Sequence, residues 1–217
     1  MQTWRPVTRT WTWANPMASN PGRKLRAFRL VLWGLVAVAA IGATMLFMNR
    51  PGTQAVEAFY ARPFELVDQD GAVVTEASYL GKPSAWFYGF THCPDVCPTA
   101  LAEMSAILEA LGPDADKVQV VFVSVDPERD TPEIMKDYVE YFDPRIDGLT
   151  GSLEGVSEMA KDRYIFFEKV PMEGGGYQME HQASIQLVDA QGQFFGTLAA
   201  EEGFDVRLAK VRRLIGS

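Results

Sequence analysis

The sequence predicts an α/β domain with a mixed β-sheet, preceded by one transmembrane helix. Two continuous apolar runs, at residues 84–90 and 118–125, are typical of strands that are covered on both faces. Each run is followed by residues whose spacing and capping signals indicate a helix. The third observation is the uncharged stretch 30–49, whose 20 residues would form about 30 Å of helix and match a bilayer's hydrocarbon core.

Basic residues determine the expected orientation of the transmembrane helix. Four of them precede the apolar stretch and only Arg50 follows closely; the four are Arg23, Lys24, Arg26 and Arg29. The positive-inside rule therefore places the N-terminus in the cytoplasm and the C-terminal domain on the far side. We expect a single-pass inner (cytoplasmic) membrane protein with a periplasmic domain. A mitochondrial inner-membrane protein is the alternative, because the acid-free, Arg-bearing N-terminus resembles a transit peptide.

The apolar stretch also divides the chain into regions. Residues 1–29 are basic and lack an apolar period, so we expect them to be disordered; translation begins at either Met1 or Met17. Residues 50–62 are expected to form a linker, and residues 63–217 the folded domain. We favour a retained anchor, residues 30–49, over a cleaved signal peptide, because the apolar run is long for a signal sequence.

The folded domain is expected to begin with a β-hairpin over residues 64–74, with Asp70-Gly71 at its turn. The predicted elements that follow are strand 84–90, helix 98–111, strand 118–125, helix 131–142, strand 148–150, helix 152–161, strands 184–189 and 193–198, and helix 205–215. Strands and helices alternate before a final hairpin and helix. This order matches a thioredoxin-like domain with an added N-terminal β-hairpin.

Charge is distributed unevenly along the chain. The net charge is −8, but seven of the 20 Lys and Arg residues lie within the first 50 positions, which contain no acid. All 28 acidic residues therefore lie in the remainder of the chain. A surface so acidic disfavours nucleic acid and anionic lipid as partners of the domain.

Both cysteines of the chain, Cys93 and Cys97, lie where the first central strand is followed by a helix. A helix N-terminus favours thiolate over thiol, and residues four apart on a helix share one face. Two sulfur atoms so placed either hold one soft metal ion or form a redox disulfide with each other. A purely structural disulfide is the third alternative, although a loop this short constrains little of the unfolded chain.

The chain has two histidines, and we expect His181 to be the third metal ligand. It directly precedes a central strand, and in a thioredoxin-like sheet the loop before that strand lies beside the cysteine loop. Two thiolates and one imidazole suit Cu(I), because the set is soft and of low coordination number. Cu(II) is the second oxidation state that we consider. Zinc is the rival metal, but it normally takes four ligands. His92 is expected to support the loop.

Three motifs in this order resemble the SCO/SenC family. They are Gly-Phe-Thr-His-Cys-Pro-Asp-Val-Cys-Pro at 89–98, Phe-Val-Ser-Val-Asp-Pro-Glu-Arg-Asp-Thr-Pro at 122–132, and His181 before an Ala-Ser-Ile strand. The resemblance covers residues 60–215 and implies a membrane-anchored, thioredoxin-like copper protein. It further implies that Cys93, Cys97 and His181 bind copper for the binuclear site of cytochrome c oxidase subunit II. The family usually has Asp where this chain has Glu180, so we do not assign Glu180 as a ligand.

The segment 126–130 follows the second central strand at its C-terminal end, where α/β folds place their sites. The resemblance makes Asp126 and Arg129 part of the functional face, as residues that support the cysteine loop or contact a partner. Turn formation ahead of a helix is the alternative role for an Asp before Pro. Met172 and Met179 flank a glycine-rich loop near His181, where we favour a loop or core role over copper binding.

The leading hypothesis is a copper metallochaperone, which is not a conventional enzyme. In an oxidising compartment its cysteines need a thiol reductase partner, and its copper needs an upstream donor. The alternative is a thiol–disulfide oxidoreductase that acts on oxidase subunit II or another extracytoplasmic protein. The Cys-x-x-x-Cys spacing differs from the Cys-x-x-Cys of thioredoxins, which disfavours that alternative. A peroxidase would need an arginine beside one reactive thiol, and Arg129 is the one candidate.

Overall fold

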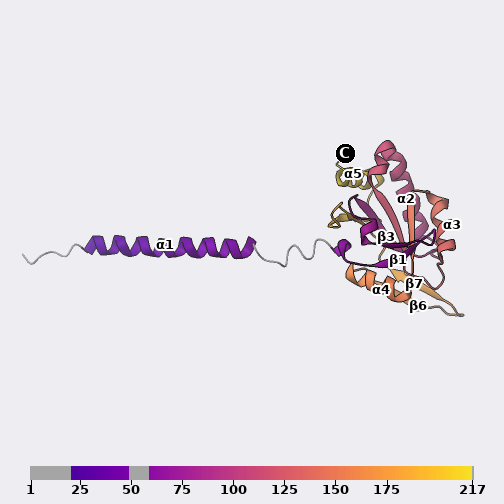
Figure 1. Ribbon diagram of the computed structural model, residues 1–217, viewed down its shortest axis with the longest axis horizontal. Helices are drawn as coiled ribbons and strands as arrows, with labels where there is room; N and C mark the ends of the chain where they lie inside the picture. Colours follow the sequence, from indigo (N-terminus) through magenta and orange to yellow (C-terminus); the bar gives the residue numbers. More distant parts are fainter. Residues whose placement is uncertain (1–20, 49–58, 217) are drawn as a thin grey trace, which may run out of the picture. The chain divides into compact units, whose positions relative to one another are not determined.

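The computed structural model describes residues 21–48 and 59–216, in two units (Figure 1). The first unit contains helix α1 (Pro21–Met48), within which residues 28–45 are long and apolar enough to cross a membrane. The helix begins earlier than the predicted anchor at 30–49, so residues 21–29 are helical rather than disordered. The prediction of disorder for residues 1–20 lies outside the described residues.

The second unit is built on a mixed sheet. Its strands are β1 (Glu65–Asp68), β2 (Val73–Thr75), β3 (Ser84–Gly89), β4 (Gln119–Ser124), β5 (Ile146–Thr150), β8 (Ile185–Val188) and β9 (Phe194–Leu198). They are arranged in the order β2-β1-β5-β4-β3-β8-β9. The central strands β3, β4 and β5 run parallel, whereas β8 pairs antiparallel with β3. This arrangement confirms the predicted α/β class and the N-terminal hairpin, whose strands β1 and β2 pair antiparallel.

Every residue of β3 and all but the first residue of β4 are buried, which explains why both strands read as continuous apolar runs. The helices of this unit are α2 (Val96–Leu111), α3 (Pro132–Phe142), α4 (Leu153–Asp162) and α5 (Phe204–Leu214), with single-turn or short 3₁₀ helices at Phe59–Ala61, Glu76–Ser78 and Gly112–Lys117. Helix α2 packs against α5 and α3, while α3 also packs against β5 (Figure 1).

A second, two-stranded sheet was not expected from the sequence. It consists of β6 (Phe167–Pro171) and β7 (Tyr177–His181), which pair antiparallel as a hairpin. Its turn contains three consecutive glycines, 174–176, all with positive φ, a conformation that side chains disfavour. The predicted glycine-rich loop is therefore the tip of a hairpin, and His181 is the last residue of a strand instead of lying in a loop.

The domain begins before residue 63, because Phe59–Ala61 form a 3₁₀ helix where a linker was expected. Tyr60 is buried, its ring centroid lies 5.2 Å from that of Trp86, and its hydroxyl donates a hydrogen bond to Gln186 of β8. The buried guanidinium of Arg163 lies 5.2 Å from the Tyr60 ring centroid. These contacts tie the chain entering the domain to the centre of the sheet.

Replacing Tyr60 with alanine tests whether this entry segment belongs to the core. We expect the free energy of unfolding of Tyr60→Ala to fall by about 3–5 kcal/mol, because a large buried ring is lost. Tyr141 is 84% exposed, so Tyr141→Ala is the matched control, with an expected change within about 0.5 kcal/mol. Chemical denaturation followed by circular dichroism measures the free energy of unfolding of both variants. Equal values for Tyr60→Ala and Tyr141→Ala would contradict the assignment of Tyr60 to the core.

Candidate metal centre

The two cysteines lie at the junction between β3 and α2. Cys93 is in the loop before the helix and is half-buried, whereas Cys97 is in the first turn of α2 and fully buried. The backbone N–H of Cys97 donates a hydrogen bond to Cys93 Sγ over 3.4 Å. The sulfurs therefore approach because the loop folds back onto the helix N-terminus, not because both residues share a helical face.

His181 reaches this pair from the end of β7. Its Nε2 lies 3.5 Å from Cys97 Sγ, while its Nδ1 lies 3.0 Å from the backbone carbonyl oxygen of Gln182. A carbonyl oxygen can only accept, so Nδ1 carries the proton and Nε2 offers its lone pair toward the sulfur. The imidazole packs edge-on against the rings of Phe87 and Phe90, at centroid distances of 6.0 and 5.7 Å. Burial lowers the pKa of His181, which favours the neutral, metal-binding form.

The ligand atoms of Cys93, Cys97 and His181 all lie within 4.8 Å of one another. Among the described residues they form the one group of three or more Cys, His, Asp or Glu side chains close enough to hold a metal ion. Two sulfurs and one nitrogen form a soft donor set with low coordination number, which fits Cu(I) better than zinc or the harder divalent ions.

Burial shifts the pKa of the Cys97 thiol upward, whereas a helix N-terminus was expected to lower it. It raises the pKa of the Cys97 thiol well above its usual range, since the side chain is removed from solvent. The expectation that this position favours thiolate therefore fails for Cys97. In the metal-free protein Cys97 is a thiol, and a metal that binds it must displace its proton.

An open cavity of about 430 Å³ adjoins the metal ligands and is lined in part by Cys93, His181, Met179 and Glu180. Met179 is buried in its wall, whereas Met172 is exposed near the tip of the hairpin. Glu180 is exposed, and its carboxylate is not among the clustered ligand atoms.

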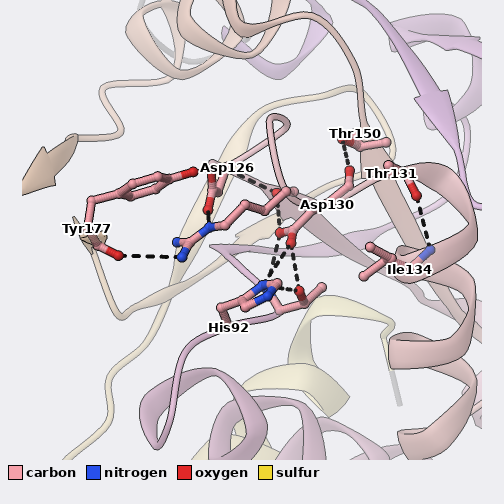
Figure 2. A network of polar contacts seen from close by, with 10 residues as sticks. His92, Asp126, Asp130, Thr131, Ile134, Thr150 and Tyr177 are labelled. Atoms are coloured by element: carbon pink, nitrogen blue, oxygen red, sulfur yellow. Dashed lines mark hydrogen bonds and ion pairs between the residues drawn. The ribbon is translucent and has the colours of Figure 1, made fainter. Parts of the chain in front are cut away.

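His92 points toward Asp130 (Figure 2). Its Nδ1 lies 3.7 Å from Asp130 Oδ1 and 3.1 Å from Thr91 Oγ1. The carboxylate of Asp130 is fully buried and also accepts hydrogen bonds from the backbone N–H and the hydroxyl of Thr91. These contacts are compatible with the supporting role predicted for His92, which stays a prediction, and they involve a carboxylate with no distinguishing signal in the sequence.

Asp126 and Arg129 belong to the same segment as Asp130, and Figure 2 shows Asp126 beside Tyr177. The backbone carbonyl of Asp126 accepts from the N–H groups of Arg129 and Asp130, so the segment is a turn. Its side chain is also buried and forms an ion pair with Arg129. The turn role weighed for this motif is therefore present, whereas its role on a functional face stays a prediction. Tyr177, whose hydroxyl donates to Asp126, was missed because a lone tyrosine carries no distinguishing signal in the sequence.

The fold and the ligand group together define a thioredoxin-like domain with a Cys₂His site at the start of a helix. The family model described as SCO1/SenC matches residues 52–216, and the chain belongs to this family.

Solved and curated relatives resemble the chain over this same region. The structure of Bradyrhizobium japonicum ScoI with copper bound has 44% sequence identity and a TM-score of 0.66, covering 70% of this chain and 98% of that one. Protein SCO1 homolog 1 of Arabidopsis thaliana mitochondria is 36% identical over 146 residues, which are 67% of this chain and 44% of that protein. The chain thus spans under half of that relative.

A third relative, BsSco, is described as a member of the Sco family of cytochrome c oxidase assembly proteins with a disulfide switch. It has 27% sequence identity and a TM-score of 0.59, over 74% of this chain and 94% of that one. These structural matches confirm the thioredoxin-like fold predicted from the sequence.

Gly89, the last residue of β3, allows Cys97 to approach the sheet. A Cβ atom at this position would lie 2.7 Å from Cys97 Sγ and 2.8 Å from Phe122 Cε2. We expect Gly89→Ala to lower the free energy of unfolding by about 1–3 kcal/mol, because the buried thiol and ring must shift. Gly196 of β9 has nothing within 4 Å of the corresponding position, so Gly196→Ala is the control. Similar denaturation midpoints for the two variants would show that the packing of Cys97 and Phe122 against position 89 does not require glycine there.

Proposed function

We propose that the chain is a copper metallochaperone that binds Cu(I) through Cys93, Cys97 and His181 and delivers it to the binuclear copper site of cytochrome c oxidase subunit II. The observation that carries the proposal is the clustering of these three ligand atoms within 4.8 Å. The copper bound to the related ScoI supports the choice of metal. Copper here is cargo, and the protein's task is to hold and release it without a covalent reaction.

The arrangement of the ligands suits transfer to a partner. Cys97 is buried, whereas Cys93 and His181 are half-buried and border the open cavity. A cysteine of the receiving protein entering this cavity would meet Cu(I) from the side of Cys93 and His181. Because Cu(I) is held by few soft ligands, ligands of the receiving protein would replace His181, then Cys93 and finally Cys97, and each released cysteine thiolate would take up a proton.

The location of the domain follows from α1 in this proposal. The basic residues that precede the helix orient it with the domain outside the cytoplasm, where the receiving subunit exposes its copper site. That compartment is oxidising, so a thiol reductase must return Cys93 and Cys97 to thiols before copper loads. A separate protein donates the copper.

A thiol–disulfide oxidoreductase is the second candidate, favoured by the contact between the Cys97 amide and Cys93 Sγ and by the disulfide switch of the related BsSco. In that reaction Cys93, the more exposed thiol, attacks a target disulfide and releases one target thiol. Cys97 then displaces the second, so that the pair loses two electrons and two protons and the target gains them.

Copper binding by the reduced full-length chain in detergent tests the leading proposal. We expect one Cu(I) per chain under anaerobic competition with a chelator, because the described residues offer one such group. His181→Ala should weaken Cu(I) binding at least about tenfold, since a three-ligand site becomes a two-ligand site. Tyr141→Ala is the control, because this exposed side chain on α3 lies outside the ligand group and should leave the affinity within about twofold.

Two outcomes would contradict this assignment. Equal affinities of wild type and His181→Ala would remove the imidazole from the site. The absence of stoichiometric copper, together with rapid exchange of a Cys93–Cys97 disulfide with a dithiol, would favour the oxidoreductase instead.

A further inference from the structure

The hairpin that carries His181 is not joined to the main sheet. Strands β6 and β7 hydrogen-bond to each other and form a separate two-stranded sheet. A two-stranded hairpin alone is marginally stable in water. Since backbone pairing does not hold the hairpin against the domain, contacts of its side chains and the short connection from His181 to β8 fix where His181 lies.

One face of β7 supplies these contacts. Successive side chains of a strand alternate between faces, so Tyr177, Met179 and His181 share one face, while Gln178 and Glu180 share the other. Met179 is buried and Glu180 is exposed, which identifies the first face as the one turned toward the domain. Tyr177 and His181 are about 13 Å apart along the strand.

Tyr177 makes the most extensive contact at the far end of this face. Its hydroxyl donates to Asp126 Oδ1 over 2.9 Å, and its backbone carbonyl accepts from Arg129 Nη1 over 3.4 Å. Its ring centroid lies 4.0 Å from the guanidinium carbon of Arg129 and 3.9 Å from Lys169 Nζ. Partial burial and Asp126 raise the pKa of Tyr177, so the hydroxyl remains a donor at neutral pH. Figure 2 shows Tyr177 facing Asp126.

Apart from the ring contact with Lys169 of the same hairpin, these contacts end on one short segment. Within the described chain, the hydrogen bonds between the hairpin strands and the domain, apart from those of His181, go to residues 126–129. They comprise the Tyr177 contacts and the exposed ion pair between Lys169 and Glu128. Exposed ion pairs contribute little, so the Tyr177 contacts are the stronger of these polar contacts, and they act together with the burial of Met179 in the core.

We propose that Tyr177 is a positioning residue for the metal site. Together with Asp126 and Arg129 it forms a hairpin latch, which holds β7 so that His181 Nε2 stays beside the two sulfurs. The latch lies too far from the sulfurs to bind the metal, and it acts on Cu(I) only through His181. The effect on copper rests on the proposed function, whereas the effect on the hairpin does not.

Tyr177→Phe removes the hydroxyl and keeps the ring, which isolates the bond to Asp126. In the metal-free full-length chain we expect amide hydrogen exchange across residues 177–181 to accelerate about tenfold, because a hydrogen bond to a charged group is lost. Cu(I) affinity should fall about tenfold as well. Tyr141→Phe, at an exposed tyrosine on α3, should change neither quantity.

A double-mutant cycle separates positioning from general destabilisation. In a His181→Ala background the additional Tyr177→Phe change should leave Cu(I) affinity unaltered, since the latch has no ligand left to position. A further loss in that background would overturn the proposal, as would wild-type exchange and affinity in Tyr177→Phe itself. If His181→Ala alone binds copper normally, the proposed function fails, and the exchange measurement still decides whether the latch exists.

Discussion

A buried carboxylate, that of Asp130, fixes the position of the cysteine loop. It is fully buried and accepts hydrogen bonds from the Thr91 backbone N–H (3.0 Å), the Thr91 hydroxyl (2.6 Å) and the Ser124 hydroxyl (2.6 Å). A buried carboxylate is costly unless its oxygens are paired, so these bonds strongly favour one arrangement of the chain. Thr91 is two residues before Cys93, so the hydrogen bonds that hold Thr91 also restrict where the Cys93 thiol lies.

The same segment organises the other half of the site. Asp126, four residues before Asp130, receives the hydroxyl of Tyr177 and thereby contacts the hairpin that ends in His181. The segment follows β4 at the C-terminal edge of the parallel strands, where α/β folds gather groups from several loops. The thiols and the imidazole thus come from separate parts of the chain and are related through residues 126–130.

The sequence predicted the parts of this molecule whose signal is local. Strands β3 and β4 are apolar throughout, and Cys93 and Cys97 are close in the chain. The pairing of these thiols with His181, 84 residues from Cys97, required the expected thioredoxin-like topology as well. The hairpin β6–β7 was missed because its strands are short, half polar and separated by glycines. The raised pKa of Cys97 and the burial of Tyr60 both depend on tertiary packing, which no local pattern reveals.

A copper ion held by two sulfurs and one nitrogen is the centre of the proposed function. X-ray absorption at the copper edge of the reduced, Cu(I)-loaded chain measures this ligand set. We expect a three-coordinate ion with two sulfur ligands and one imidazole nitrogen, from Cys93, Cys97 and His181. A first shell of two sulfurs without nitrogen, or one that contains four ligands, would contradict it.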